Sequence, residues 1–511
     1  MSNQSEVNSY KQIKMGAMIA YVGIFVNIAS GLIYTPWMIK NIGQANYGLY
    51  TLSVSLISLF VMDFGLSAAL TRFISKYNSK EDQTSINNVL GIAYKLYVLL
   101  DIVIGIVLVI AYLFIGIMYK ELTPQEIETL KGIYLITACF SVVSFPFVTL
   151  SSILTSYEKF VFLKGSELFN RVLSLVLIIG ALSMGYGIYT LVTINAVTGI
   201  TTIFIKLVII KKVTPVKVNF FYKSRKMLKE ILAFSVWSTI ITVSQRFIFN
   251  IMPSLLGIFA GSASIAVFGT AATIEGFVFT FASGINGMFL PKVSRLVNKE
   301  ESESDLFALM VKVGRIQFII IGLLFVGFLS LGRNFIELWI DDSFRNAYYC
   351  AVLLVIPSLI ELPQHIASIT VVAVNKVKLQ SFVYTGMAVI NIILSSLLIK
   401  RMGEIGAALS ICISYLFRTL AMNLIYKKAL NLNVKGFFIQ CFAKLGGAFF
   451  IALICAALLA FIFPSGSWIL LLIQGIVVTG IYMLSMWLFA LNSYEKSLFL
   501  SYFKKLIRTG R

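Results

Sequence analysis

The chain has 511 residues, of which 59% are hydrophobic and only 13% are charged, and its formal net charge is +20. A mean hydropathy of +0.90 excludes an ordinary soluble globular protein. A basic balance can indicate nucleic-acid binding, but here Lys and Arg alternate with hydrophobic segments, which indicates membrane topology and no nucleic-acid partner.

Hydrophobic segments predict an all-α integral membrane protein with about 14 transmembrane helices, because roughly 20 apolar residues cross a bilayer. The first six spans are expected at residues 17–39, 49–70, 89–118, 132–155, 162–184 and 188–210. The other eight are expected at residues 231–256, 265–290, 309–331, 349–374, 382–398, 405–425, 445–463 and 469–491.

The distribution of basic residues predicts the orientation of the spans. About 30 of the 42 Lys and Arg fall on one side, about 7 on the other and about 5 inside spans. Loops rich in Lys and Arg stay in the cytoplasm, so we expect both termini to be cytoplasmic. The first span follows a polar start and has full length, which predicts a retained anchor and not a cleaved signal peptide.

A basic segment at 211–230 separates the first twelve spans into two sets of six. We therefore expect an N-terminal lobe at 1–210, a cytoplasmic connector at 211–230 and a C-terminal lobe at 231–427. Residues 428–511 are expected to form two further spans and a basic tail, whose interleaved aromatic residues predict an interfacial helix. The loops expected on the outer side, 119–131 and 332–348, are too short for a catalytic domain.

Several prolines fall inside the predicted spans. Because proline removes a backbone hydrogen bond, each is expected to bend its helix. These are Pro36, Pro146, Pro253, Pro357 and Pro363. Such bends would suit a protein whose two halves move against each other. They could equally serve to improve the packing of the helices.

Ionisable side chains inside spans are costly and usually face a bundle interior or a water-filled cavity. The candidates are Asp63, Lys95, Asp101, Glu167, Arg171, Arg246, Glu275, Glu361, His365 and Arg418.

The basic members predict an anion-binding site. Arg246 is deep in its span with Asn250 one turn on, and Arg418 lies near the middle of another. A guanidinium group stays ionised and binds phosphate oxygens in a fork, although both could instead pair with protein carboxylates. Lys95 could snorkel to the interface or line a cavity, and Arg171 could form an i, i+4 ion pair with Glu167 or bind substrate.

The acidic members are candidates for ion coupling. Glu275, Asp63 and Asp101 are single carboxylates in separate spans, and Glu361 precedes His365 by one helical turn. His365 is the only histidine of the chain, and an imidazole near neutral pH could carry a coupling proton. A hydrogen-bonded packing contact explains the Glu361 and His365 pair equally well.

The sequence offers no sign of a cofactor or of an enzyme site. The five cysteines have neither paired nor metal-ligand spacing, and no glycine-rich phosphate loop or nucleophile with a histidine partner occurs. We therefore expect no metal, no cofactor and no catalytic residue.

Two sets of short motifs resemble a known family. The first is Pro36-Trp37 followed by Tyr47-Gly48-Leu49-Tyr50, Asp63-Phe64-Gly65-Leu66 and Arg72. The second is Phe268-Gly269, then Gly284 and Leu290-Pro291-Lys292-Val293-Ser294. With the fourteen-span layout, the chain resembles the bacterial polysaccharide flippases, which translocate O-antigen and capsule repeat units. They belong to the multidrug/oligosaccharidyl-lipid/polysaccharide exporter superfamily.

This resemblance implies a cavity between two six-helix lobes that opens alternately to each side. The implied cargo is a glycan on undecaprenyl pyrophosphate, carried to the outer leaflet of the bacterial inner membrane, for lipopolysaccharide O-antigen or capsule. The ion gradient would drive the cycle, and polymerase and glycosyltransferase machinery would be partners beside membrane lipids. Arg246, Arg418, Lys95, Arg171 and Asn250 would then contact the headgroup or glycan.

Other functions remain open from sequence. A cation-coupled multidrug exporter of the same superfamily would have an acidic cavity for cationic cargo. A glycan polymerase or ligase would need a longer outer loop. Lipid II transport is disfavoured, because that relative is expected to carry an essential arginine in its first helix and this chain has none between Met1 and Arg72.

Overall fold

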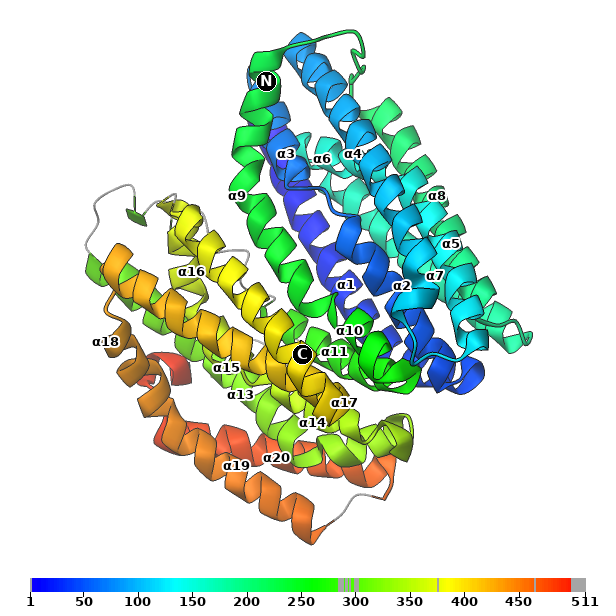
Figure 1. Cartoon of the computed structure of the whole chain (residues 1–511). Coiled ribbons are helices and arrows are strands. Elements are labelled where there is room, and N and C mark those ends of the chain that lie inside the picture. Colours follow the sequence, from blue (N-terminus) through cyan, green and yellow to red (C-terminus); the bar gives the residue numbers. More distant parts are fainter. Residues whose placement is uncertain are drawn as a thin grey trace, which may run out of the picture. The chain divides into compact units, whose positions relative to one another are not determined.

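Helices make up almost all of the computed structural model, which describes residues 2–283, 289, 293, 296–297, 303–374, 376–463 and 466–497 (Figure 1). These residues contain no β-strand, so the predicted all-α class is confirmed. Most of the second family motif, at 284–294, and the tail from 498 onward lie outside the described residues.

The N-terminal part of the chain forms long helices joined by short turns. They are α1 (Ser2–Ile42), α2 (Gln44–Phe60), α3 (Leu66–Asn78), α4 (Gln83–Met118), α5 (Pro124–Ser144), the 3₁₀ turn η1 (Phe145–Val148), α6 (Thr149–Ser156), α7 (Phe160–Ser183), α8 (Ile188–Val213), α9 (Arg225–Phe249), α10 (Met252–Phe259) and α11 (Gly261–Ser283).

The C-terminal part contains more interrupted helices. They are α13 (Glu303–Trp339), η3 (Asp342–Phe344), α14 (Asn346–Val355), α15 (Ser358–Glu361), η4 (Leu362–Gln364), α16 (His365–Ala373), α17 (Val377–Ala429), α18 (Val434–Phe438), the π-helical turn η5 (Ile439–Ala443), α19 (Lys444–Ile462) and α20 (Trp468–Phe489).

Eleven helices of the described chain are long and apolar enough to cross a membrane, or 12 if the bent pair Arg225–Trp237 and Thr239–Phe259 forms one span. One of the 11 is α17, whose 53 residues would extend about 80 Å as a single helix, far beyond the roughly 30 Å of hydrocarbon. Gly403, with φ 55° and ψ −132°, interrupts its helical geometry. The interruption falls between the predicted spans 382–398 and 405–425, although the count of 14 itself is not confirmed.

Four of the five span prolines coincide with helix interruptions. Pro146 lies in η1 between α5 and α6, and Pro253 lies in the first turn of α10. Pro357 precedes α15, and Pro363 lies in η4. Pro36 is the exception, because α1 continues through it. Loss of the proline N–H explains why the helix tightens or restarts at the other four positions.

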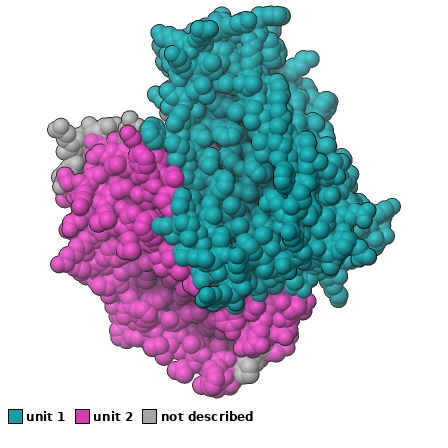
Figure 2. All heavy atoms as spheres, in the orientation of Figure 1, with its two compact units in different colours: residues 1–269, 388–407 teal, residues 270–387, 408–511 magenta. Residues whose placement is uncertain are grey.

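The chain divides into two compact units, coloured separately in Figure 2. Unit 1 contains residues 1–269 and 388–407, and unit 2 contains residues 270–387 and 408–511. These units are defined by which residues pack together, whereas the lobes expected from the sequence are defined by the number of spans in each. The units therefore do not test the lobes, which stay a prediction.

Unit 1 packs its helices in neighbouring pairs. In it α7 lies between α1 and α8, while α5 contacts both α2 and α8. The outward sides of these helices are apolar, as expected for contact with lipid: Ile102 on α4 is 58% exposed and Phe204 on α8 is 66% exposed.

Unit 2 is built around α13, which contacts α14, α16, α19 and α20. Its core is apolar and includes Val326, Phe437, Ala452 and Tyr482, all with side chains closed to solvent. Tyr482 donates its hydroxyl hydrogen to the carbonyl oxygen of Ile319 over 3.0 Å, which satisfies the polar end of this buried ring. The central helix α13 also contacts the interrupted segment α15–η4–α16, which bears the polar residues described next.

Candidate functional site

A buried ion pair in unit 2 joins two of the predicted site residues. Arg418 on α17 contacts the carboxylate of Glu361 at the end of α15. The arginine side chain is 5% exposed and that of Glu361 is 28% exposed, so the pair is closed on the guanidinium side and open on the carboxylate side. A charge this deep requires a counter-ion, which Glu361 supplies.

Tyrosine side chains complete the surroundings of Arg418. Its Nη1 donates to the Tyr384 hydroxyl over 3.1 Å, and the guanidinium carbon lies 4.7 Å from the centre of the Tyr415 ring. Cation–π contact adds to the stabilisation of the buried charge. The Nε of Arg418 is buried and has no hydrogen-bond acceptor among the described residues, so one donor of the group is unused.

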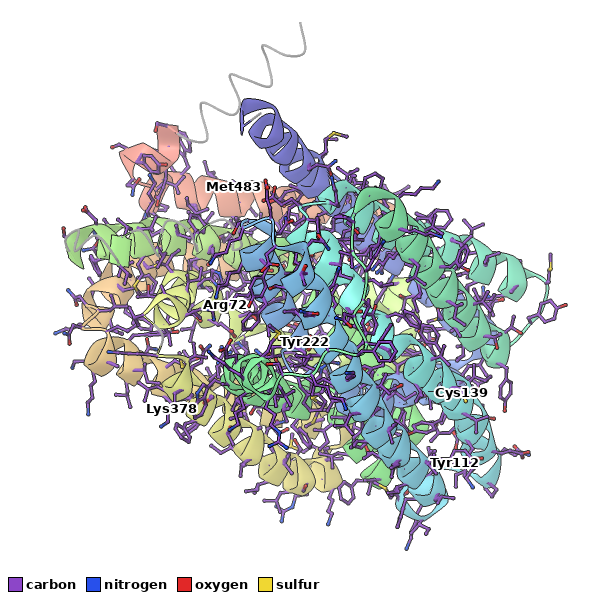
Figure 3. The ribbon with its side chains drawn as sticks, turned by 90° about the horizontal axis from the view of Figure 1, so that it is seen from above. Arg72, Tyr112, Cys139, Tyr222, Lys378 and Met483 are labelled. Atoms are coloured by element: carbon purple, nitrogen blue, oxygen red, sulfur yellow. The ribbon has the colours of Figure 1, made fainter. Side chains whose placement is uncertain are left out.

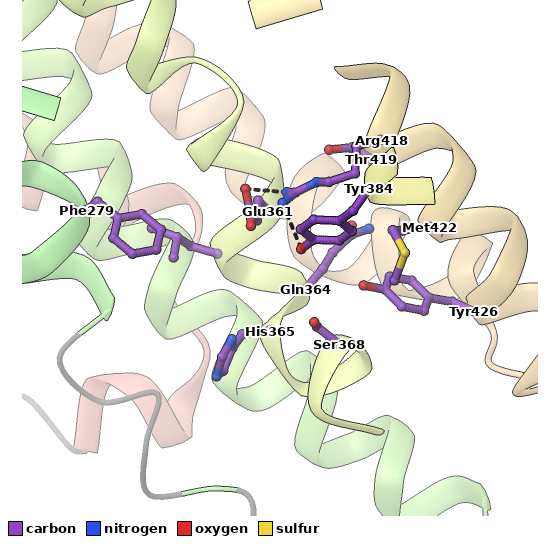
Figure 4. A pocket seen from close by; sticks show the side chains of 11 residues that line it. Phe279, Glu361, Gln364, His365, Ser368, Tyr384, Arg418, Thr419, Met422 and Tyr426 are labelled. Atoms are coloured by element: carbon purple, nitrogen blue, oxygen red, sulfur yellow. Dashed lines mark hydrogen bonds and ion pairs between the residues drawn. The ribbon is translucent and has the colours of Figure 1, made fainter. Parts of the chain in front are cut away.

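A cavity of about 220 Å³ opens beside this ion pair (Figure 4). It is lined by Phe279, Glu361, Leu362, Gln364, His365, Ser368, Tyr384, Arg418, Thr419, Met422 and Tyr426. In Figure 4, Glu361 and Tyr384 turn toward Arg418, whereas His365 points away from the ion pair. The lining combines aromatic rings, an amide, hydroxyl groups and one ion pair, all of which can bind a polar ligand.

The interrupted span explains how these side chains come together. Pro363 has no N–H, and the chain tightens into the 3₁₀ turn η4 between Glu361 and His365. Gln364, in this turn, donates to the side-chain oxygen of Asn423 over 2.8 Å and so ties the turn to α17. The expected one-turn spacing of Glu361 and His365 is thus altered by the turn, yet both residues still line the cavity.

Glu275 is a second candidate carboxylate in unit 2. It is on α11, partly buried, and close enough to Glu361 for the two carboxylates to interact electrostatically. The described residues contain no group of three or more His, Cys, Asp or Glu that could hold a metal ion.

Arg246 belongs to unit 1 and has a different environment from Arg418. It is half-buried in the last turn of α9, where the helix dipole favours a cation. Within the described residues its guanidinium group has no ion-pair or hydrogen-bond partner. Asn250 caps this helix, because its backbone N–H donates to the Arg246 carbonyl over 3.0 Å.

The other basic candidates lie on exposed faces of their helices. Lys95 is exposed and donates to the backbone carbonyl of Tyr222 over 3.0 Å. Arg171 is exposed on α7, and the partner of Glu167 is Lys164, at 3.0 Å, so the expected Glu167–Arg171 ion pair is wrong. The i, i+3 lysine competes for the same carboxylate from the preceding turn.

The two acidic candidates of unit 1 are Asp63 and Asp101. Asp63 occupies the break between α2 and α3, where its carboxylate accepts from the backbone N–H groups of Gly65 over 3.3 Å and Ser67 over 3.2 Å. It therefore caps α3. Asp101 is partly buried on α4, and its Oδ1 has no hydrogen-bond partner among the residues described.

Sequence reasoning missed the most complete buried ion pair of the described chain. Arg315 on α13 donates from Nε and Nη2 to both oxygens of Glu495, over 2.6 and 2.8 Å. Its Nη1 also donates to the carbonyl oxygen of Gln440, in the π-helical turn η5, and its Nη2 to that of Ala490, at the end of α20. Arg315 falls inside the predicted span 309–331, and that position was the signal that could have identified it.

These features define a polytopic helical membrane protein with a polar, charge-neutral cavity in one unit and, in the other, an arginine that has no partner among the described residues. Residues 14–297, more than half of the chain, match the family described as polysaccharide biosynthesis protein, and the chain belongs to that family. No curated protein matches the chain.

Solved structures share the fold at low sequence identity. The chain resembles the lipid II flippase MurJ in an inward closed conformation, with a TM-score of 0.68 and 14% identity over 93% of this chain and 98% of that one. It also resembles an inward-facing MATE family transporter of the MOP superfamily, with a TM-score of 0.67 and 14% identity over 81% and 98% of the two chains.

A third relative by structure is a MOP superfamily transporter from Pyrococcus furiosus, described as having a binding pocket of reversed polarity. Its TM-score is 0.59, with 14% identity over 83% of this chain and 95% of that chain. The recognised superfamily fold is thereby confirmed. These relatives are described as a flippase and as transporters, not as enzymes.

Proposed function

We propose that this protein flips oligosaccharides linked to undecaprenyl pyrophosphate from the cytoplasmic to the outer leaflet, for surface polysaccharide such as O-antigen or capsule. Family membership and the fold shared with a flippase and transporters support this function. The bacterial inner membrane would be its location, with both termini in the cytoplasm, and glycosyltransferases and a polymerase would act before and after it.

The guanidinium group of Arg246, which has no partner among the described residues, is the observation that carries the proposal. A pyrophosphate headgroup must cross roughly 30 Å of hydrocarbon, and a fixed cation within the bundle lowers the cost of that passage. Among the residues described, Arg246 has no protein carboxylate to neutralise it, so it can bind an anionic ligand. Asn250, one turn beyond, would contact the same ligand.

The pair Glu361–Arg418 suits ion coupling better than direct headgroup binding. Its charges already neutralise one another, and a pyrophosphate would have to displace Glu361 to reach Arg418. Protonation or cation binding at Glu361, with Glu275 close by, would release Arg418 and alter the contact between α15 and α17. The cavity beside the pair, with Tyr384, Tyr426 and Gln364 in its lining, would accommodate part of the glycan.

Complementation with variants of Arg246 tests this function. In a strain that lacks this gene and relies on it for surface polysaccharide, the wild-type gene should restore polymer. We expect Arg246→Ala to reduce polymer at least about tenfold, since charge-assisted hydrogen bonds contribute about 1.5–3 kcal/mol, and to leave lipid-linked repeat units accumulated inside. Arg246→Lys should restore polymer partially, because it keeps the charge and loses the fork.

Gln245, the exposed neighbour of Arg246, provides the matched control, and Gln245→Ala should complement fully. Normal polymer from Arg246→Ala at equal expression would refute the headgroup role. If wild type itself restores no polymer, the cargo assignment fails.

A cation-coupled multidrug exporter is the second candidate, favoured by the neighbouring carboxylates Glu275 and Glu361 in unit 2. It predicts that loss of the gene sensitises cells to cationic drugs while surface polysaccharide is unchanged. The two readouts from one deletion strain therefore separate the candidates.

A further inference from the structure

The connector between α8 and α9 is fastened to the start of α4. Asn87 accepts from the backbone N–H of Lys217 over 2.9 Å, and its carbonyl accepts from the Asn219 N–H over 3.1 Å. Asn88 accepts from the Asn219 side chain over 2.8 Å, and Lys95 holds the Tyr222 carbonyl (Figure 3, where Tyr222 is labelled). The segment thus has a defined path although residues 214–224 form no helix.

Gly91 permits this close approach. A Cβ atom at that position would lie 1.8 Å from the carbonyl oxygen of Asn219, so any side chain would push the connector away from α4. The backbone of the connector packs directly on the backbone of the helix.

Two aromatic residues of the connector are exposed close to the position where the outer face of α4 becomes apolar. Phe221 is 94% exposed and Phe220 is 56% exposed, with the Phe220 ring 6.0 Å from that of Tyr94. One turn beyond Tyr94, about 6 Å along the helix, Val98 is 48% exposed and starts the apolar outer face. Aromatic side chains at such a polar–apolar boundary belong to the headgroup region of a bilayer.

Unpaired basic residues surround these phenylalanines. Residues 211–230 contain seven Lys and Arg, all exposed, against the single acidic residue Glu230. The seven are Lys211, Lys212, Lys217, Lys223, Arg225, Lys226 and Lys229. Within the described part of the chain none of their charged groups has an ion-pair or hydrogen-bond partner.

We propose that this connector surface, residues 211–229 with Phe221 at its centre, is a binding site for anionic phospholipid headgroups. Phe221 enters the headgroup region while the basic side chains bind phosphate groups around it. An acidic protein would suit the charge equally, but Phe221, nearly fully exposed and adjacent to Phe220, whose ring lies 6.0 Å from that of Tyr94 on α4, favours the bilayer. This site is separate from Arg246 and from the cavity in unit 2, and it requires no assumption about the cargo.

Spin-labelled lipids measure the proposed preference directly. The full-length protein is reconstituted in phosphatidylcholine vesicles, and the motionally restricted fraction of spin-labelled phosphatidylglycerol is compared with that of spin-labelled phosphatidylcholine. We expect the wild type to prefer phosphatidylglycerol at least about threefold. The triple variant Lys217→Gln/Lys223→Gln/Lys226→Gln should lower that ratio at least about twofold, and Phe221→Ser should lower it as well.

The control variant Lys120→Gln/Arg345→Gln/Arg401→Gln removes the same charge from exposed positions outside the connector sequence and should leave the ratio unchanged. About 0.5 M salt should abolish the wild-type preference, a result that does not depend on how a variant folds. An unchanged ratio in the connector variant, or an equal fall in the control, would overturn the proposal. Loss of surface polymer by the connector variant with an unchanged lipid ratio would also overturn it and indicate an acidic protein partner.

Discussion

Arg418 and Arg246 show how the same residue type acquires different properties from its neighbours. Arg418 is nearly closed to solvent and contacts a carboxylate and two tyrosines, whereas Arg246 is half-buried and has no side-chain partner among the described residues. Sequence placed both inside spans and left open whether each binds a ligand or a protein carboxylate. The partner of Arg418 is 57 residues away on another helix, and no local spacing rule could identify it.

A double-variant cycle tests the ion pair of Arg418. Removal of one partner leaves a buried charge alone, so Arg418→Met and Glu361→Gln should each destabilise the protein, by up to about 3–5 kcal/mol. The combined variant should recover most of that loss, because neither charge remains. Thermal unfolding of the detergent-purified protein measures the effect. A double variant whose loss of stability equals the sum of the two single losses would show that the two residues do not act as a pair.

Variants of Asp63 can distinguish a role in capping α3 from a role in ion coupling. Asp63→Ala should cost about 0.5–2 kcal/mol, because the backbone N–H groups of Gly65 and Ser67 lose their acceptor. Asp63→Asn keeps one of the two acceptor oxygens and should retain part of that stability. Polymer restored by Asp63→Asn would confine the residue to capping, whereas stable protein without polymer would assign it to coupling.

At the scale of elements, hydrophobic segments were the most reliable signal, because exposure to lipid requires long apolar helices. The breaks were predictable where proline caused them, as at Pro146 and Pro363. The predicted ion pair of Glu167 failed, since two basic side chains, Lys164 and Arg171, were within reach of one carboxylate and sequence could not rank them. Contacts between distant helices, such as the one between Arg315 and Glu495, need the tertiary fold.

The Arg315–Glu495 contact fastens α13 to the segment that follows α20. Both side chains are about 5% exposed, and the π-helical turn η5 presents the Gln440 carbonyl to the same arginine. We expect Arg315→Met to destabilise the protein by about 3–5 kcal/mol, because Glu495 becomes a buried unpaired carboxylate.

Arg333 provides the matched control on the same helix. Its ion pair with Glu337 is 47% and 33% exposed, so Arg333→Met should change stability by less than about 1 kcal/mol. Thermal unfolding of both variants in detergent makes the comparison. Equal effects would mean that burial does not determine the contribution of Arg315.

At the scale of the whole molecule, family membership and fold agree with a membrane transporter, while cargo depends on chemistry that the fold does not specify. The same fold serves proteins described as a lipid II flippase and as multidrug transporters. The cargo proposal therefore relies on Arg246 as a cation available to a pyrophosphate group.

Translocation by the purified protein in vesicles tests the central claim most directly. Proteoliposomes would contain a fluorescent oligosaccharide on undecaprenyl pyrophosphate, and a membrane-impermeant quencher would report how much of it changes leaflet over time. We predict that wild-type protein moves the lipid-linked glycan far faster than empty vesicles do, and that Arg246→Ala slows this movement at least about tenfold. Wild-type vesicles indistinguishable from empty ones, under every ion gradient applied, would contradict the account.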